Sequence, residues 1–147
     1  MGRLVKVMVA VDSVTSPWPC LLDPIFLKTF HGHGTDIGSW CGDTRILRVP
    51  LDTSGSPLSL GSNVYAHVIQ RFDGHSIRNT LTLEGFGDLL CIDSRWYVHE
   101  NQLTGEALCH VNLPQPLRWI AEMFVVSRAQ KQMNDFLLTF KNCKRSH

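Results

Sequence analysis

Histidine, cysteine and carboxylate side chains gather early in the chain and are the first candidates for chemistry. His31 and His33 are separated by one residue, and Cys20, Asp36 and Cys41 lie near them in the sequence. Imidazole and thiolate are ligands that zinc prefers. The spacing matches no established zinc pattern, so a glycine- and histidine-rich surface loop is the simpler interpretation. We expect neither a metal ion nor another cofactor.

The same stretch contains the side chains of a hypothetical hydrolase. His31 and a nearby aspartate would act with Ser54 or Ser56 as the nucleophile. A triad is normally assembled from distant parts of a fold beside an oxyanion hole, whereas these candidates crowd into about 25 residues. The motif GxSxG is absent, as are glycine-rich phosphate loops. We keep a hydrolase as a third alternative and expect that the protein is not an enzyme.

Basic side chains concentrate at the end of the chain. Residues 1–127 carry nine Lys and Arg against twelve Asp and Glu, a net charge of −3, whereas residues 128–147 carry five basic residues against Asp135 alone, a net charge of +4. Such a basic end favours an anionic partner, RNA or lipid. The predicted RNA- or lipid-binding residues are Arg128, Lys131, Lys141, Lys144 and Arg145, with Arg45 and Arg48 as a secondary basic patch.

Aromatic residues offer a second route to nucleic acid. Trp96 lies between Arg95 and Tyr97, a setting in which an indole ring can stack on a base. Tryptophan more often fills a core or an interface. A nucleic-acid-binding β-barrel that uses Trp96 and Tyr97, without a membrane role, is therefore the second alternative.

Short, closely spaced strands are expected to position these side chains. Apolar residues alternate along 3–12, and further strands are expected where β-branched and apolar residues lie between turn signals. Asp73-Gly74 is a hairpin signal, and a second turn is expected over 101–105. The expected later strands are 45–51, 63–72, 76–83, 88–93, 96–100, 106–113 and 135–141. The segment 23–30 fits either a helix or a strand.

One long helix is expected over 113–131. Leu117, Ala121 and Val125 belong to a stripe with the spacing of a core-facing helix, while Trp119, Met123 and Val126 form a second apolar row on another face. A helix with two apolar faces needs cover on both sides. The second row is therefore a candidate oligomer interface.

These elements predict an α+β fold that is mainly β, with an antiparallel β-sandwich or barrel-like sheet and one principal helix near the C-terminus. We expect one domain over residues 1–147. The five cysteines are dispersed and form no CxxC motif, which favours reduced thiols inside a cell.

The second half of the chain resembles the matrix proteins of bornaviruses and related negative-strand RNA viruses. The resemblance is carried by Gly74-His75-Ser76 with Asn79, by Gly87-Asp88-Leu89-Leu90, by the 94–98 strand and by a helix over 117–128. It implies a self-assembling structural protein, most often a tetramer. Its partners would be single-stranded RNA or ribonucleoprotein, anionic lipid and a viral glycoprotein tail. Its location would be the inner face of the virion envelope and the host cytoplasm or nucleus.

Overall fold

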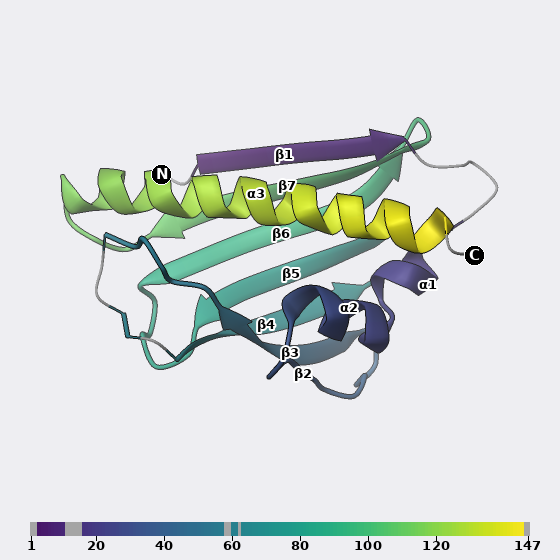
Figure 1. Cartoon of the computed structure of the whole chain (residues 1–147), viewed down its shortest axis with the longest axis horizontal. Helices are drawn as coiled ribbons and strands as arrows, with labels where there is room; N and C mark the ends of the chain where they lie inside the picture. Colours follow the sequence, from purple (N-terminus) through teal and green to yellow (C-terminus); the bar gives the residue numbers. More distant parts are fainter. Residues whose placement is uncertain (1–2, 11–15, 58–59, 62, 146–147) are drawn as a thin grey trace.

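A seven-stranded antiparallel sheet forms one of the two layers of the molecule (Figure 1). The computed structural model describes residues 3–10, 16–57, 60–61 and 63–145, with a side chain only for residue 6 in the first segment and up to residue 142 in the last. The strand order is β1-β7-β6-β5-β4-β3-β2. The bounds are β1 Arg3–Ala10, β2 Asp36–Ile37, β3 Thr44–Leu51, β4 Val64–Phe72, β5 Ser76–Leu83, β6 Leu90–His99 and β7 Gln102–Val111.

Three helices cover one face of this sheet, which we call the inner face. The long α3, Leu117–Arg145, crosses the strands, and the short α1, Trp18–Leu21, and α2, Pro24–His31, lie near β3 and β4 (Figure 1). Asp23 begins α2 by accepting a hydrogen bond from the backbone N–H of Ile25 at 3.0 Å, as N-cap residues do. The cap explains why the ambiguous segment 23–30 is helical.

Side-chain alternation along the strands separates a core face from a solvent face. On β4, Val64, Ala66 and Val68 are buried on the inner face. Leu137 and Phe140 of α3 are 6% and 2% exposed, and they belong to the core that joins helix and sheet. The expected fold class, an antiparallel α+β fold with one principal helix, is confirmed.

The strand predictions were largely correct, but the end of the sheet differs. The expected strands 88–93 and 96–100 are one strand, β6, and β7 begins at Gln102, inside the expected turn. A two-residue turn joins them, because Glu100 and Asn101 both adopt left-handed backbone angles, with φ of 51° and 61°. Such a turn matches the twist of paired strands. The part of the first expected strand beyond Ala10 lies outside the described residues.

The expected final strand over 135–141 was wrong, because α3 continues through it. An apolar run of this length fits a strand or a buried helix equally well. Ala129, Met133, Leu137 and Phe140 are buried at helical spacing, while Leu138 is 59% exposed. No glycine or proline interrupts residues 117–145, so the helix continues over the sheet.

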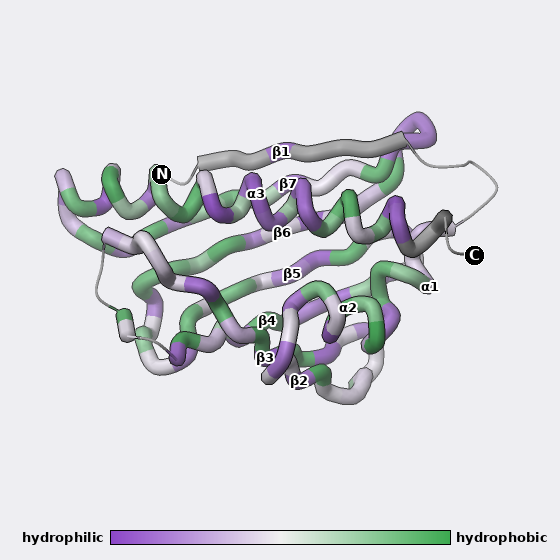
Figure 2. Tube along the Cα trace, viewed as in Figure 1, coloured by the Kyte–Doolittle hydropathy of each residue, from purple (hydrophilic) through white to green (hydrophobic). Residues whose placement is uncertain are grey.

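The first turns of α3 extend beyond the ends of the strands (Figure 1). These turns carry several hydrophobic residues, green in Figure 2. Leu117, Trp119, Ile120 and Met123 are between 45% and 52% exposed, whereas Ala121 is buried. The expected core stripe is therefore only partly buried, because the sheet does not reach under the start of the helix.

Candidate functional site

Two adjoining cavities lie between α3 and the inner face of the sheet. The first lobe, of about 130 Å³, lies under the middle of α3 and beside α2. The second, of about 120 Å³, lies under the first half of α3 and beside the loop after β3. Leu81, Ile92, Ala129 and Gln132 line both lobes. A cavity of similar size holds one aromatic ring, so two lobes suit an elongated ligand.

On the sheet side the first lobe has an apolar lining that is crossed by one row of polar residues, and Gln132 of α3 and His31 of α2 are polar residues on its helix side. Gln70, Asn79 and Ser94 lie directly opposite one another on β4, β5 and β6, and all three line this lobe. The neighbouring rows on either side are apolar. One contains Val68, Leu81 and Ile92, and the other contains Phe72, Ile77 and Trp96. A few positioned polar groups in an apolar wall are typical of small-molecule sites.

A buried arginine fixes the outer end of this row. Arg45 is only 3% exposed and lies opposite Gln70. Its Nε donates to Gln70 Oε1 at 2.7 Å, one Nη donates to the backbone oxygen of Leu22 at 2.9 Å, and its guanidinium lies 4.4 Å from the centre of the Trp40 ring. Burial lowers the pKa of this guanidinium. Because Oε1 of Gln70 is held by Arg45, the amide nitrogen of Gln70 is left for other partners.

His31 is the titratable residue of the first lobe. It ends α2, and its ring contacts Phe30 edge to face at a centroid distance of 4.9 Å. Burial lowers its pKa from 6.5 to about 4. The imidazole is therefore neutral at neutral pH, and the described lining of this lobe holds no Asp, Glu, Lys or Cys.

An ion pair stands beside the second lobe. Arg128 of α3 binds Asp52 with 3.2 Å between Nη1 and Oδ2, donates to the backbone oxygen of Ser54, and stacks on Phe124. Hydrogen bonds from the hydroxyl and backbone N–H of Ser54, followed by Arg128, lower the pKa of Asp52 to about 2. The contacts tie the loop after β3 to the helix at this side of the cavity.

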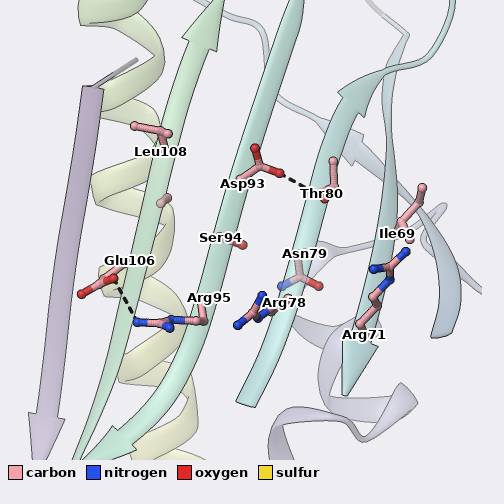
Figure 3. A pocket seen from close by; sticks show the side chains of 11 residues that line it. Ile69, Arg71, Arg78, Asn79, Thr80, Asp93, Ser94, Arg95, Glu106 and Leu108 are labelled. Carbon is pink, nitrogen blue, oxygen red and sulfur yellow. Dashed lines mark hydrogen bonds and ion pairs between the residues drawn. The ribbon is translucent and has the colours of Figure 1, made fainter. Parts of the chain in front are cut away.

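A wider groove, of about 520 Å³, lies on the opposite, outer face of the sheet (Figure 3). Arg71, Arg78 and Arg95 lie opposite one another on β4, β5 and β6. Arg95 pairs with Glu106 at 3.6 Å, and Glu106 also accepts from Tyr97 at 2.7 Å. The groove is lined by several charged residues, whereas the inner cavity has a mainly apolar lining, so the inner cavity is the better candidate for a small-molecule site.

Three of the residues predicted to bind RNA or lipid have side chains among the described residues. Arg128 is held by Asp52, whereas Lys131 and Lys141 are exposed. The side chains of Lys144 and Arg145 lie outside the described residues. Binding of RNA or anionic lipid stays a prediction.

The secondary basic patch was wrong. Residues 45 and 48 point to opposite faces of β3, because side chains alternate along a strand. Arg45 is buried beside the cavity, while Arg48 is on the outer face, where it pairs with Glu84 at 2.7 Å and lies 3.6 Å from the centre of the Tyr65 ring.

Trp96 does not provide an exposed stacking surface. It is 6% exposed on the inner face and packs against Phe136, with ring centroids 5.1 Å apart. Tyr97, one residue later, is on the outer face. The predicted base-stacking pair is therefore split between the two faces.

The hypothetical hydrolase residues are also separated. His31 lines the first lobe and Ser56 lines the second, while Ser54 contacts Arg128. Among the described residues, no hydrogen bond joins His31 to either serine. Within the same ranges, no three His, Cys, Asp or Glu side chains are placed to hold a metal ion.

The candidate oligomer interface is partly exposed to solvent. Trp119 and Met123 are 52% and 48% exposed, but Val126 is half-buried and packs against the core. Oligomer formation through the first two residues stays a prediction. None of the described helices combines the length and the apolar composition of a membrane span.

Three solved bacterial structures share this fold. A protein from Thermus thermophilus has a TM-score of 0.64 and 12% identity, over 96% of this chain and 99% of that chain. A conserved protein from Geobacillus kaustophilus has a TM-score of 0.64 and 12% identity, over 100% and 97%. A START superfamily protein from Mycobacterium smegmatis has a TM-score of 0.51 and 15% identity, over 95% and 92%.

These comparisons define the fold class as a START-like helix-grip fold, in which a curved antiparallel sheet holds a long C-terminal helix. No family model and no curated protein sequence matches the chain. The resemblance to viral matrix proteins was wrong, and so was the structural viral function, because the structural neighbours are bacterial proteins. The short segments that suggested the resemblance are two turns between strands, part of β6 and the first turns of α3.

The sequence analysis did not identify the cavity residues, and the reason lies in the pairing of the strands. Asn79 and Ser94 lie on strands that were expected, but their inner-face position depends on the register between strands. The available signal was the alternation of Ile77, Asn79 and Leu81, which places one polar side chain within an apolar face.

Proposed function

We propose that this protein binds a small, elongated and mainly apolar molecule between α3 and the inner face of the sheet. The observation that carries the proposal is the two-lobed cavity, with its apolar lining and its single polar row. The START-like fold of the Mycobacterium smegmatis protein supports it as an analogy of architecture.

We further propose that binding is not followed by chemistry. A general base works best with a pKa near the operating pH, and the pKa of about 4 makes His31 a weak one. Asp52, beside the second lobe, is held by Ser54 and Arg128 and has a pKa of about 2. These environments favour a carrier or a sensor over an enzyme.

The test is calorimetric titration with 2-naphthol and 2-methylnaphthalene, two-ring probes suited to an elongated cavity. At least one should bind in a 1:1 complex. Ala129→Phe, which places a ring between the two lobes, should weaken binding at least tenfold. Ser127→Phe is the matched control, because Ser127 is exposed on the same helix and lines neither lobe.

The wild-type protein and both variants should have similar melting temperatures, because the ring added by Ala129→Phe enters the cavity where the two lobes meet. Absence of binding to the wild-type protein by both probes would refute the proposed function. Equal binding by the wild-type protein and Ala129→Phe would place the site elsewhere.

A further inference from the structure

We infer that the ligand carries a neutral hydrogen-bond donor, a hydroxyl or an amide N–H, which Asn79 recognises. The inference rests on the proposed function and adds what the ligand must present to the polar row. It makes Asn79 the specificity-determining residue of the first lobe.

The evidence is an unpaired buried acceptor. Oδ1 of Asn79 is shielded from solvent and accepts no hydrogen bond from a described residue. Buried polar atoms in folded proteins nearly always have a partner, and leaving one unpaired costs stability. An acceptor that lines a cavity and lacks a partner is explained if a bound molecule supplies the donor.

The position of Asn79 places its unpaired acceptor beside polar side chains that a ligand can bind at the same time. On its own strand its inner-face neighbours are Ile77 and Leu81, which offer no side-chain donor. Across the sheet it lies between Gln70 and Ser94. Gln70 is held through Oε1 by Arg45, so a ligand hydroxyl can donate to Asn79 and accept from the amide nitrogen of Gln70.

Charges around the lobe argue against a cationic donor such as an ammonium group. Arg45 already places a positive charge at this row, because its Nε binds Gln70, the residue opposite Asn79. The described lining of the first lobe contains no carboxylate, and His31 is neutral there at neutral pH. A buried ammonium group would therefore have no counter-ion, whereas a hydroxyl or amide N–H needs none.

The test compares 2-naphthol with 2-methylnaphthalene, because the two differ in a hydroxyl against a methyl of similar size. The protein is titrated into each probe by calorimetry, and the ratio of the two Kd values is compared between the wild-type protein and Asn79→Leu. Comparing ratios cancels the greater hydrophobicity of the methyl compound. The ratio should shift at least tenfold toward 2-methylnaphthalene in Asn79→Leu.

Two further variants separate recognition from general damage. Asn79→Gln keeps an uncharged amide with an acceptor oxygen, so it should keep the wild-type preference for 2-naphthol to within a few-fold. Thr82→Val changes the outer face of the same strand and should leave the ratio unchanged. Asn79→Leu should also raise the melting temperature of the ligand-free protein, because it removes the unpaired acceptor.

A ratio that stays within twofold of the wild-type value in Asn79→Leu would overturn the inference while leaving the proposed function intact, and would mean that a fixed water satisfies Asn79. Loss of the preference in Asn79→Gln would overturn it as well. Failure of both probes to bind the wild-type protein would instead refute the proposed function, and the inference with it.

Discussion

Mild acid should destabilise this protein through one residue, His31. The imidazole is buried at the end of α2 against Phe30 and the first lobe of the cavity. Burial lowers its pKa from 6.5 to about 4 in the folded protein. In the unfolded chain the same ring is solvated and has its ordinary pKa.

The sign of the effect follows from the number of protons that each state binds. Between pH 6.5 and 4 the unfolded chain holds a proton on His31 and the folded protein does not, so the free energy of unfolding falls as the pH falls. Above pH 6.5 His31 is neutral in both states, so it causes no loss of stability there. Each pH unit is worth about 1.4 kcal/mol, so the loss is about 2 kcal/mol at about pH 5 and about 3 kcal/mol at about pH 4.

Urea denaturation at about pH 7 and about pH 5 measures this loss. The window avoids the carboxylates of Asp73, Glu84 and Glu106, whose pKa values are lowered by hydrogen bonds and nearby cations and which therefore titrate at lower pH. His31→Gln should remove most of the pH dependence, whereas His33→Gln, a change at an exposed position two residues away, should retain it. Wild-type protein that loses less than about 0.5 kcal/mol between these pH values would refute the reasoning.

Two further substitutions test the packing of the site, and a double substitution tests oligomer formation. Gly105→Ala should lower the free energy of unfolding by about 1–3 kcal/mol through overpacking, because a Cβ there would lie 2.5 Å from the Trp96 ring. Urea denaturation measures this loss, and an unchanged midpoint would contradict the packing described. Arg45→Met should cost about 1–3 kcal/mol in the same assay, because the oxygens that it binds lose their donor; a stabilised variant would contradict this. Light scattering at micromolar concentration should show a homo-oligomer, predicted as a tetramer, which Trp119→Lys with Met123→Lys converts to a monomer; a wild-type monomer would end the oligomer prediction.

The strands could be predicted because each pairs an alternating apolar pattern with a clear turn. Asp73-Gly74 separates β4 from β5, and Asp73 caps the turn by accepting from the backbone N–H groups of His75 and Ser76, both at 2.7 Å. A turn of this kind is specified by residues that are neighbours in the sequence, so it can be predicted. The end of α3 was not predictable in the same way, because only packing on the sheet decides between a helix and a strand for residues 135–141.

The residues of the site cannot be predicted from any single strand, because they come together only through the pairing of several strands. Arg45, Gln70, Asn79 and Ser94 are spread over fifty positions of the chain, and register alone brings them into one row. The charged residues that attracted attention in the sequence are mostly exposed or paired with neighbours. The proposed function depends on buried polar residues of the inner face, which composition and charge do not reveal.

The most direct test of the binding site is a two-dimensional ¹H–¹⁵N NMR titration with 2-naphthol. We expect saturable changes at the side-chain amides of Asn79 and Gln70 and at the indole N–H of Trp96, with none at the side-chain Nε–H groups of Arg78 and Arg95, which lie on the outer face. Changes confined to the outer groove, or to the overhanging turns of α3, would contradict a binding site between α3 and the sheet.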